Sequence, residues 1–398
     1  MFISCSTKEE LWPIPPAGKA LIGGYWNPAE EPVQRPSVLE WAEGRILHLE
    51  DCPAGTLSCP PDWRDWREYL LMPGWIDAHV HLALDSIDFN LCLERWQDPP
   101  AMEAGIVRFL RRYRQLGICA IRDGGDLPGY GWSAHEKTAA GRWLGPEVIS
   151  VREALYRRGR YGRFLGRGVG DIRQWREQRE QFLSQGQAQV KLIVSGIISF
   201  REYGIVGAPQ WSLPELREIV SDAHARGLAV MAHVSGTEAV GLALAAGVDT
   251  LEHGYYITSA QLEEMARRGV AWVPTVAPTG NILRQETDRY SADEKQVLTR
   301  IVQQHLTRVS EAHALGVHLG LGTDAGAYLV GHADSLLEEM AWFRQAGLPA
   351  REVCRLATEG NAVIIGRPEL GRLVAGSAMA NLQLRNTDNT DNYRCQGD

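Results

Sequence analysis

From residue 72 onward, short apolar runs alternate along the chain with longer amphipathic segments. Each run is short enough for one buried strand, and helical patterns lie between successive runs. Eight runs predict strands, at residues 75–81, 118–122, 147–151, 190–194, 229–233, 250–253, 271–276 and 319–323. Eight strands that each precede a helix are typical of a (β/α)8 TIM barrel, an α/β fold. A doubly wound open sheet is the alternative, but it seldom needs eight such regular units.

Helix-start signals support this alternation. Ser212 and Glu215 have the spacing of a capping box, and Thr258 and Gln261 repeat that spacing further along the chain. Gly269 stands where the second of these helices is expected to end. The apolar positions after the first box share one helical face, at Leu216, Ile219, Val220 and Ala223.

The two ends of the chain have a different composition. The N-terminal part up to the first predicted strand is rich in proline and tryptophan, and two strand-like runs within residues 38–49 are separated by Glu43 and Gly44. This pattern predicts a hairpin in a small β unit. Residues 386–398 are polar and lack any core-forming pattern, so we predict that they are disordered.

Length and charge limit the classes of function. A chain of 398 residues fits two domains, or one large barrel with an accessory piece. The formal net charge of −8 argues against a surface dedicated to nucleic acid or to an anionic membrane, because both need a basic excess. The charge says nothing about the substrate itself, because a local basic pocket can sit in an acidic protein. As partners we expect a small-molecule substrate, no nucleic acid and no membrane, with a homo-oligomer left open.

Cysteine usage and hydropathy bear on the compartment. The seven cysteines are odd in number and no pair has C-x-x-C spacing, which is typical of a reducing compartment. The N-terminus lacks the apolar core of a signal peptide. The longest apolar stretch, residues 239–251, is too short to span a bilayer and contains Asp249. We expect a soluble, cytoplasmic protein.

Four of the eleven histidines stand at the ends of predicted strands. His79 and His81 are two residues apart, so both imidazoles face the same side of a strand, here the barrel lumen. Such a pair fits either a zinc site or two hydrogen-bonded core histidines. His233 and His253 end strands one βα unit apart, and Asp324 follows the eighth strand, which would close against the first. Each of these three alone also fits a packed histidine or a helix cap.

Lys191 stands inside a run that otherwise reads as a fully buried strand. An unpaired lysine is almost never buried, so this side chain needs a carboxylate partner, a lowered pKa or a covalent change. Three interpretations stay open for the residue alone. They are a buried ion pair, a Schiff-base lysine, and carboxylation by carbon dioxide, which would create an anion able to bridge two metals.

Together, these six side chains fall at the carboxyl ends of the first, fourth, fifth, sixth and eighth predicted strands. That rim is where barrel enzymes place their active sites. The sequence therefore predicts a catalytic centre made of four histidines, one lysine and one aspartate.

The same stretches resemble the amidohydrolase superfamily, whose members are metal-dependent hydrolases on a (β/α)8 barrel. The matching segments are the strand of Lys191 and residues 72–81, 232–234, 251–254, 322–326 and 357–362, which run in the family's order. Within the superfamily, the spacing and residues 273–275 are most similar to the prolidase-like, imidazolonepropionase-related branch.

The resemblance implies two divalent metal ions, expected to be zinc. It divides the ligands into His79, His81 and Asp324 on one ion, His233 and His253 on the other, and carboxylated Lys191 together with a hydroxide as bridges. The hydroxide would attack a polarised carbonyl, and Asp324 would be the catalytic residue that moves the proton.

The resemblance also implies two domains. A small β-sandwich would form from residues 1–72 and 370–385, beside a barrel of residues 73–369. Residues 376–382 depart from the family's usual Gly-Lys-x-Ala-Asp-Leu ending, which bears on the C-terminal edge strand and not on the site.

The loop after the third predicted strand is strongly basic, with five arginines within residues 156–168. It is either a solvated loop or the source of an arginine, such as Arg157 or Arg160, that grips a substrate carboxylate. Tyr203 and Tyr255 lie near the predicted mouth and could bind substrate or simply pack. Prolidase-like relatives hydrolyse dipeptides with a free carboxylate, although their loop carries a Gly-Gly-His element that this chain lacks. We expect cleavage of an amide bond in a small carboxylated substrate, such as a dipeptide or an N-acyl amino acid.

Three alternatives stay open. The substrate could be a cyclic amide or a lactone. The chain could be a non-catalytic barrel relative, against which the complete set of ligands argues. It could also be an aldolase-type barrel that uses Lys191 as a Schiff base.

Overall fold

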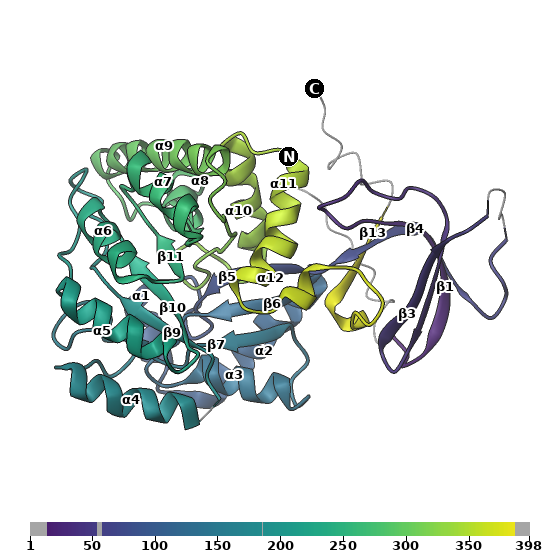
Figure 1. Cartoon of the computed structure of the whole chain (residues 1–398), viewed down its shortest axis with the longest axis horizontal. Helices are drawn as coiled ribbons and strands as arrows, with labels where there is room; N and C mark the ends of the chain where they lie inside the picture. The colour runs from purple at the N-terminus through teal and green to yellow at the C-terminus, as the bar shows by residue number, and fades with distance from the viewer. Residues whose placement is uncertain (1–13, 54–57, 185, 387–398) are drawn as a thin grey trace.

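The computed structural model describes residues 14–53, 58–184 and 186–386 of the chain. Parallel strands form the centre of its larger part, and helices cover them on the outside (Figure 1). One sheet has the order β5-β6-β7, made of Trp75–Val80, Ile118–Asp123 and Glu147–Ser150. The other has the order β12-β11-β10-β9-β8, made in chain order of β8 (Ala154–Leu155), β9 (Gln189–Ile193), β10 (Ala229–Val234), β11 (Thr250–His253) and β12 (Ala271–Val273).

The helices of this part alternate with the strands, as the sequence predicts. They are α1 (Phe89–Arg95), α2 (Pro99–Gln115), α3 (Tyr130–Ala139), α4 (Ile172–Ser184), α5 (Leu213–His224), α6 (Thr237–Ala246), α7 (Ser259–Arg268), α8 (Ala277–Arg284), α9 (Ala292–Ala314), α10 (Asp334–Gln345), α11 (Ala350–Arg355) and α12 (Asn361–Ile364), with short π and 3-10 turns at Leu356–Gly360, Pro368–Gly371 and Met379–Asn381. Both predicted capping boxes are confirmed, at the starts of α5 and α7. Gly269 ends α7 with a φ of 69°, in the left-handed region that glycine tolerates.

The eighth predicted strand, residues 319–323, is not a regular strand, whereas the other seven are confirmed with small differences at their ends. Two of its backbone N–H groups bind side chains instead of a neighbouring strand. Leu321 N–H donates to Asn361 Oδ1, and Thr323 N–H donates to Asp77 Oδ1. Its remaining backbone bonds reach both neighbouring strands, since Ala78 donates to Leu321 O and Gly320 donates to the carbonyl of Trp272. Within the described ranges, regular pairing is therefore not continuous around a closed barrel, and the confirmed part of the prediction is the α/β fold.

Both ends of the described chain meet in one five-stranded sheet, seen at the right of Figure 1. Its order is β13-β4-β1-β2-β3, made of Leu382–Asn386, Arg64–Pro73, Gly18–Tyr25, Ser37–Ala42 and Arg45–Asp51. The predicted hairpin is confirmed as β2-β3, with Glu43 and Gly44 at φ values of 51° and 68°. The described residues form a single sheet here, where two packed sheets of a sandwich were expected. Asn386 belongs to β13 and not to the predicted tail, while residues 387–398 lie outside the described part.

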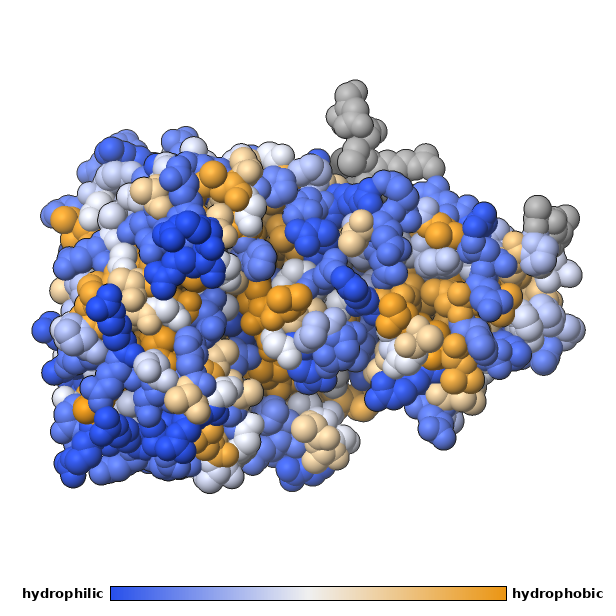
Figure 2. All heavy atoms as spheres, viewed as in Figure 1, coloured by the Kyte–Doolittle hydropathy of each residue, from blue (hydrophilic) through white to orange (hydrophobic). Residues whose placement is uncertain are grey.

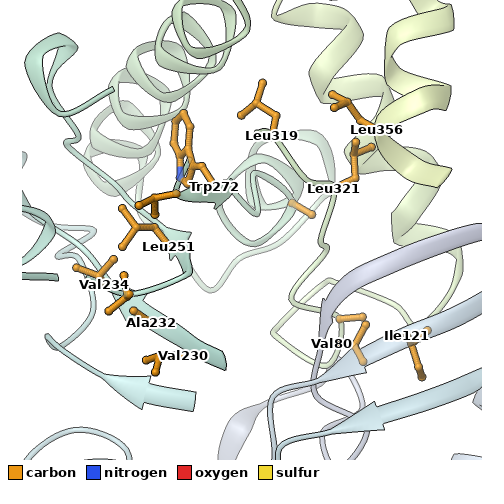
Figure 3. Close-up of a cluster of buried hydrophobic side chains, with 14 of the residues drawn as sticks. Val80, Ile121, Val230, Ala232, Val234, Leu251, Trp272, Leu319, Leu321 and Leu356 are labelled. Carbon is orange, nitrogen blue, oxygen red and sulfur yellow. The ribbon is translucent and has the colours of Figure 1, made fainter. Parts of the chain in front are cut away.

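Alternation along the strands separates a packed outer face from an inner face. Figure 3 shows Val230, Ala232 and Val234 of β10 in a buried cluster with Leu251 and Trp272 from the next two strands. Successive side chains of a strand point to opposite faces. The intervening residue of β10, His233, therefore points to the opposite, inner face of the sheet, and the same alternation on β9 turns Lys191 to that face.

Hydrophilic residues prevail over much of the surface seen in Figure 2, while apolar residues gather near the middle of that face and over the five-stranded sheet. Among the described residues, no helix combines the length and the hydrophobicity needed to cross a membrane.

Candidate metal centre

The imidazoles of His79 and His81 meet Asp324 at the carboxyl end of β5. Nε2 of His79 lies 3.6 Å from Asp324 Oδ1, and Nε2 of His81 lies 3.5 Å from the same oxygen. The three potential ligand atoms lie within 4.8 Å of one another. Two neutral imidazole nitrogens and a carboxylate oxygen are donors that zinc accepts in proteins. The structure thus brings three of the six predicted residues to one point that could hold a cation.

Lys191 enters the same cluster from β9 and is fully buried. Its Nζ lies 3.0 Å from Nε2 of His79 and 3.0 Å from Nε2 of His81. Burial lowers the pKa of Lys191 to about 8, and the negative charge of Asp324 opposes that shift. About a tenth of the amine is therefore uncharged at pH 7, far more than for a lysine with the ordinary pKa, and an uncharged amine is the nucleophilic form.

His233 and His253 complete the group. The centroids of their rings lie 4.6 Å apart, and the ring of His253 lies 5.1 Å from that of His79. Nδ1 of His253 is 2.7 Å from Thr275 Oγ1, which leaves its other nitrogen for a ligand. Nε2 of His233 is buried and has no hydrogen-bond partner among the described residues. Burial lowers the pKa of His233 to about 3, so its imidazole is neutral and can bind a cation.

Glu252 fixes the orientation of the His79 ring, and Arg122 in turn holds Glu252 in place. Glu252 Oε2 lies 2.8 Å from Nδ1 of His79, while its Oε1 accepts from Arg122 Nη2 at 2.8 Å and from Thr250 Oγ1 at 2.6 Å. Both Glu252 and Arg122 are fully buried. A carboxylate on Nδ1 fixes the tautomer that carries the proton there, so the lone pair of Nε2 points into the cluster.

The position of Asp324 is fixed by its own backbone and by Asp77, which binds the preceding residue. Its φ is 56°, a conformation that is uncommon for a residue other than glycine, and its N–H donates to the carbonyl of His79 at 2.7 Å. The preceding residue, Thr323, donates from Oγ1 to Asp77 Oδ2 at 2.7 Å. Burial raises the pKa of Asp324 to about 7, with the charge of Lys191 acting in the opposite direction.

A cavity of about 620 Å³ reaches this cluster. His81, Lys191, His233, His253 and Asp324 form its polar end. Most of the remaining wall is apolar or aromatic and comprises Leu84, Phe89, Tyr161, Phe164, Leu165, Ile197, Ile198, Phe200, Tyr255, Pro278, Ala327 and Tyr328. An apolar cavity with a few polar groups at one end is the usual form of a small-molecule site.

Two of the four predicted substrate contacts line this cavity, namely Arg160 and Tyr255. Arg157 instead forms an ion pair with Glu215 and lies over the ring of Trp211 at 5.4 Å. The role of Arg157 in substrate binding stays a prediction.

Tyr203 also lies away from the cavity lining. Its hydroxyl donates to Gln304, and the guanidinium of Arg300 lies 3.6 Å from the centre of its ring. Tyr256 accepts from the N–H of Gly204 at 2.9 Å, which agrees with a packing residue. A contact between Tyr203 and substrate stays a prediction.

Some arginines of the basic loop have a hydrogen-bond or ion-pair partner, and others have none in the described protein. Arg158 donates to Gly168 O and to Gln174, and Arg167 pairs with Glu153 at 2.8 Å. Arg160 and Arg163 both line the cavity, and neither guanidinium has a hydrogen bond or an ion pair to any described residue. The mouth of the apolar cavity therefore carries two positive charges that the described protein does not neutralise.

A cluster of imidazoles and a carboxylate at the carboxyl ends of parallel strands, open to a cavity, defines a metal-dependent enzyme of the α/β class. The family model described as the Amidohydrolase family matches residues 70–390. The chain belongs to this family and is a metal-dependent amidohydrolase.

Several known proteins are similar over most of the chain. An uncharacterized protein of Mycobacterium tuberculosis is 27% identical over 303 residues, which cover 75% of each protein. Ochratoxinase from Aspergillus niger is 25% identical over 338 residues, 78% of this chain and 69% of its own. Its solved structure has a TM-score of 0.74 at 22% identity and covers 91% of this chain and 88% of its own. A Xaa-Pro dipeptidase structure has a TM-score of 0.77 at 21% identity and covers 92% of this chain and 93% of its own.

Proposed function

We propose that this protein hydrolyses an amide bond in a small substrate that carries a free carboxylate and a large apolar group, such as a dipeptide or an N-acyl amino acid. The observation that carries the proposal is the position of the six predicted ligands. Five of them line one end of an apolar cavity, and the sixth, His79, lies directly behind them beside Lys191 and Asp324. The lining also includes two arginines without a partner in the described protein. The Xaa-Pro dipeptidase, whose structure is similar to this one, acts on dipeptides, which belong to this class of substrate.

The donor set fits two divalent cations, and zinc is the expected metal. His79, His81 and Asp324 would hold one, His233 and His253 the other, and Lys191, carboxylated by carbon dioxide, would reach both. The buried Nε2 of His233, which has no partner in the described protein, supports a cation ligand role for this nitrogen. When bound, such metals supply a water with a lowered pKa and an electrophile for a carbonyl oxygen.

Carboxylation of Lys191 would also account for its burial. As an amine, Lys191 places a potential charge among two imidazoles and beside buried Arg122, whose charge also lowers the pKa of the lysine. As a carbamate, it would be an anion with two oxygens among groups that bind cations. The carbamate nitrogen forms one bond to the carbon of carbon dioxide and loses one proton to solvent.

In the proposed reaction, Asp324 transfers the proton and Glu252 keeps the His79 ring in one tautomer. Water oxygen forms the new bond to the carbonyl carbon, and the carbon–nitrogen bond breaks. The Asp324 carboxylate takes the proton of the water and passes it to the leaving nitrogen. Glu252 holds the Nδ1 proton of His79 throughout, so that Nε2 stays available.

Arg160 is the residue that we assign to the substrate carboxylate. Its guanidinium is exposed, lines the cavity and has no partner in the described protein. A charge-assisted bond to a carboxylate contributes about 1.5–3 kcal/mol, which is about 10- to 100-fold in KM. Phe89, Phe164 and Leu84 provide an apolar wall for the rest of the molecule.

The test is a hydrolysis screen with protein reconstituted with zinc and bicarbonate. The panel holds dipeptides, N-acyl amino acids, their carboxyamide forms, and lactones. We expect turnover of acids with large apolar groups and weak turnover of their carboxyamides.

Arg160→Ala should raise KM for the acids about 10- to 100-fold and leave the carboxyamides unaffected. Arg158→Ala, in the same loop but bonded to Gly168 and Gln174, is the matched control. Wild-type activity confined to lactones, or no activity on the whole panel, would refute the proposal.

A further inference from the structure

Thr275 follows β12 and has a backbone conformation that its residue type disfavours. Its φ is 49°, in the left-handed region, where a β-branched side chain is an outlier. The residue is fully buried. Strain of this kind persists only where the surrounding structure fixes the residue, and it gathers at functional sites. The conformation of Thr275 therefore points to a role beyond packing.

Buried hydrogen bonds hold the backbone on both sides of Thr275. Nε2 of His305, on α9, donates to the carbonyl of Pro274 at 3.0 Å. The hydroxyl of Tyr255 donates to the carbonyl of Thr275 itself at 3.3 Å. The rings of His305 and Tyr255 stack with their centroids 4.6 Å apart, and both residues are buried. Two packed side chains therefore fix the peptide groups that flank the strained residue.

The hydroxyl of Thr275 lies against a predicted metal ligand. Its Oγ1 is 2.7 Å from Nδ1 of His253 and has no other hydrogen-bond partner among the described residues. His253 is also left-handed, with a φ of 66°, so both residues of this bond depart from ordinary strand geometry. Because Nδ1 of His253 faces Thr275, Nε2 is the nitrogen that remains for the imidazole cluster.

We propose that Thr275 is a positioning residue for the His253 side of the metal centre. Its hydroxyl accepts the Nδ1 proton of His253, which leaves the lone pair on Nε2 and fixes the orientation of the ring. The left-handed backbone at Thr275 is retained because it directs the hydroxyl at this ring. The inference rests on the proposed function and adds to it a residue that binds neither metal nor substrate.

The experiment compares Thr275→Val and Thr275→Ser in zinc competition titrations, with urea unfolding to verify that each protein is folded. Valine keeps the shape of the side chain and removes the hydroxyl, whereas serine keeps the hydroxyl. Thr279→Val is the control, because Thr279 is also buried but its hydroxyl bonds Val276 O at 3.2 Å and the Tyr255 hydroxyl at 3.4 Å. We expect Thr275→Val to bind one zinc ion about 10- to 100-fold more weakly, and the other two variants to stay within about threefold of the wild type. If Thr275→Val does not fold, Thr275→Ala takes its place, since it removes the hydroxyl and the branched side chain together.

The outcomes separate this inference from the proposed function, because the titration needs no turnover. Unchanged zinc binding in Thr275→Val would overturn the positioning role. An equal loss in Thr275→Ser or in Thr279→Val would also overturn it, because a purely structural role predicts no rescue by the hydroxyl. A wild type that binds two zinc ions but hydrolyses nothing on the panel would overturn the proposed function and support the role of Thr275 if only Thr275→Val loses affinity. A wild type that retains no zinc would overturn both.

Discussion

Replacing Glu252 with glutamine removes one negative charge from behind His79 and preserves the shape of the side chain. In the wild type, Glu252 bonds three groups, which are His79 Nδ1 at 2.8 Å, Arg122 Nη2 at 2.8 Å and Thr250 Oγ1 at 2.6 Å. The glutamine amide can present a donor to His79 Nδ1, which would favour the wrong tautomer and place the proton on Nε2. The metal would then have to displace that proton.

Two magnitudes follow from this geometry. Loss of a carboxylate partner of a ligating histidine lowers metal affinity about 10- to 100-fold, equivalent to about 1.4–2.8 kcal/mol. Arg122 is fully buried and would lose its carboxylate, and breaking a buried ion pair costs about 3–5 kcal/mol of folding stability. We expect the lower end of that range, because Arg122 keeps its bond to Ala78 O at 2.7 Å.

The assay is a zinc competition titration against a chromophoric chelator, at a temperature at which all proteins are folded, together with urea unfolding. Glu339→Gln is the matched control. Glu339 is also fully buried, but it accepts from the backbone amides of Val276 and Ala277 and has no hydrogen bond or ion pair to the imidazoles within the described part of the chain. Zinc affinity of Glu252→Gln within about twofold of the wild type, or an equal loss in Glu339→Gln, would refute the positioning role.

Further predictions concern pH, carbon dioxide and packing. Burial lowers the pKa of His332 to about 4 from about 6.5 when unfolded, so the unfolded chain binds more protons in that window and stability falls as the pH decreases. In urea titrations from pH 7 to 4.5, His332→Gln should flatten this slope by up to about 1.4 kcal/mol per pH unit, and parallel slopes would contradict the prediction. Carbon-13 NMR with labelled bicarbonate should give a carbamate signal that is absent in Lys191→Arg; a signal that survives in the variant would exclude Lys191 as its source. A Cβ at Gly322 would lie 2.5 Å from Val273 Cγ1 and 2.7 Å from His79 Cβ, so Gly322→Ala should cost about 1–3 kcal/mol and weaken zinc binding. Gly331→Ala meets nothing within 4 Å and should do neither; equal melting temperatures of the two variants would contradict the packing argument.

Much of the fold could be predicted because apolar runs and capping boxes are local signals. Residues 319–323 could not be assigned correctly from local pattern, because their amides are taken by distant side chains. Asp77, which binds Thr323, lies 246 residues away in the sequence. Hydrogen bonds of this kind depend on the completed fold, and they replace the ladder that the apolar run alone suggests.

The six residues of the candidate site could be predicted because they stand at strand ends or inside apolar runs. Arg122 and Glu252 carry the same signal as Lys191, a charged residue within an apolar strand, and this signal identifies them as further members of the buried polar cluster. The basic loop was harder to interpret. Arg157 is neutralised by Glu215, which lies 58 residues further along the chain, and only the folded structure separates it from Arg160.

The central claim is that six side chains of this chain bind two divalent cations. Metal analysis of protein reconstituted with zinc and bicarbonate, then freed of excess metal, tests it most directly. We predict two zinc ions per chain in the wild type and one in His233→Asn. The substitution removes Nε2 of His233, a buried nitrogen that has no partner in the described protein. A wild-type protein that retains no zinc above the level in the buffer would contradict the account.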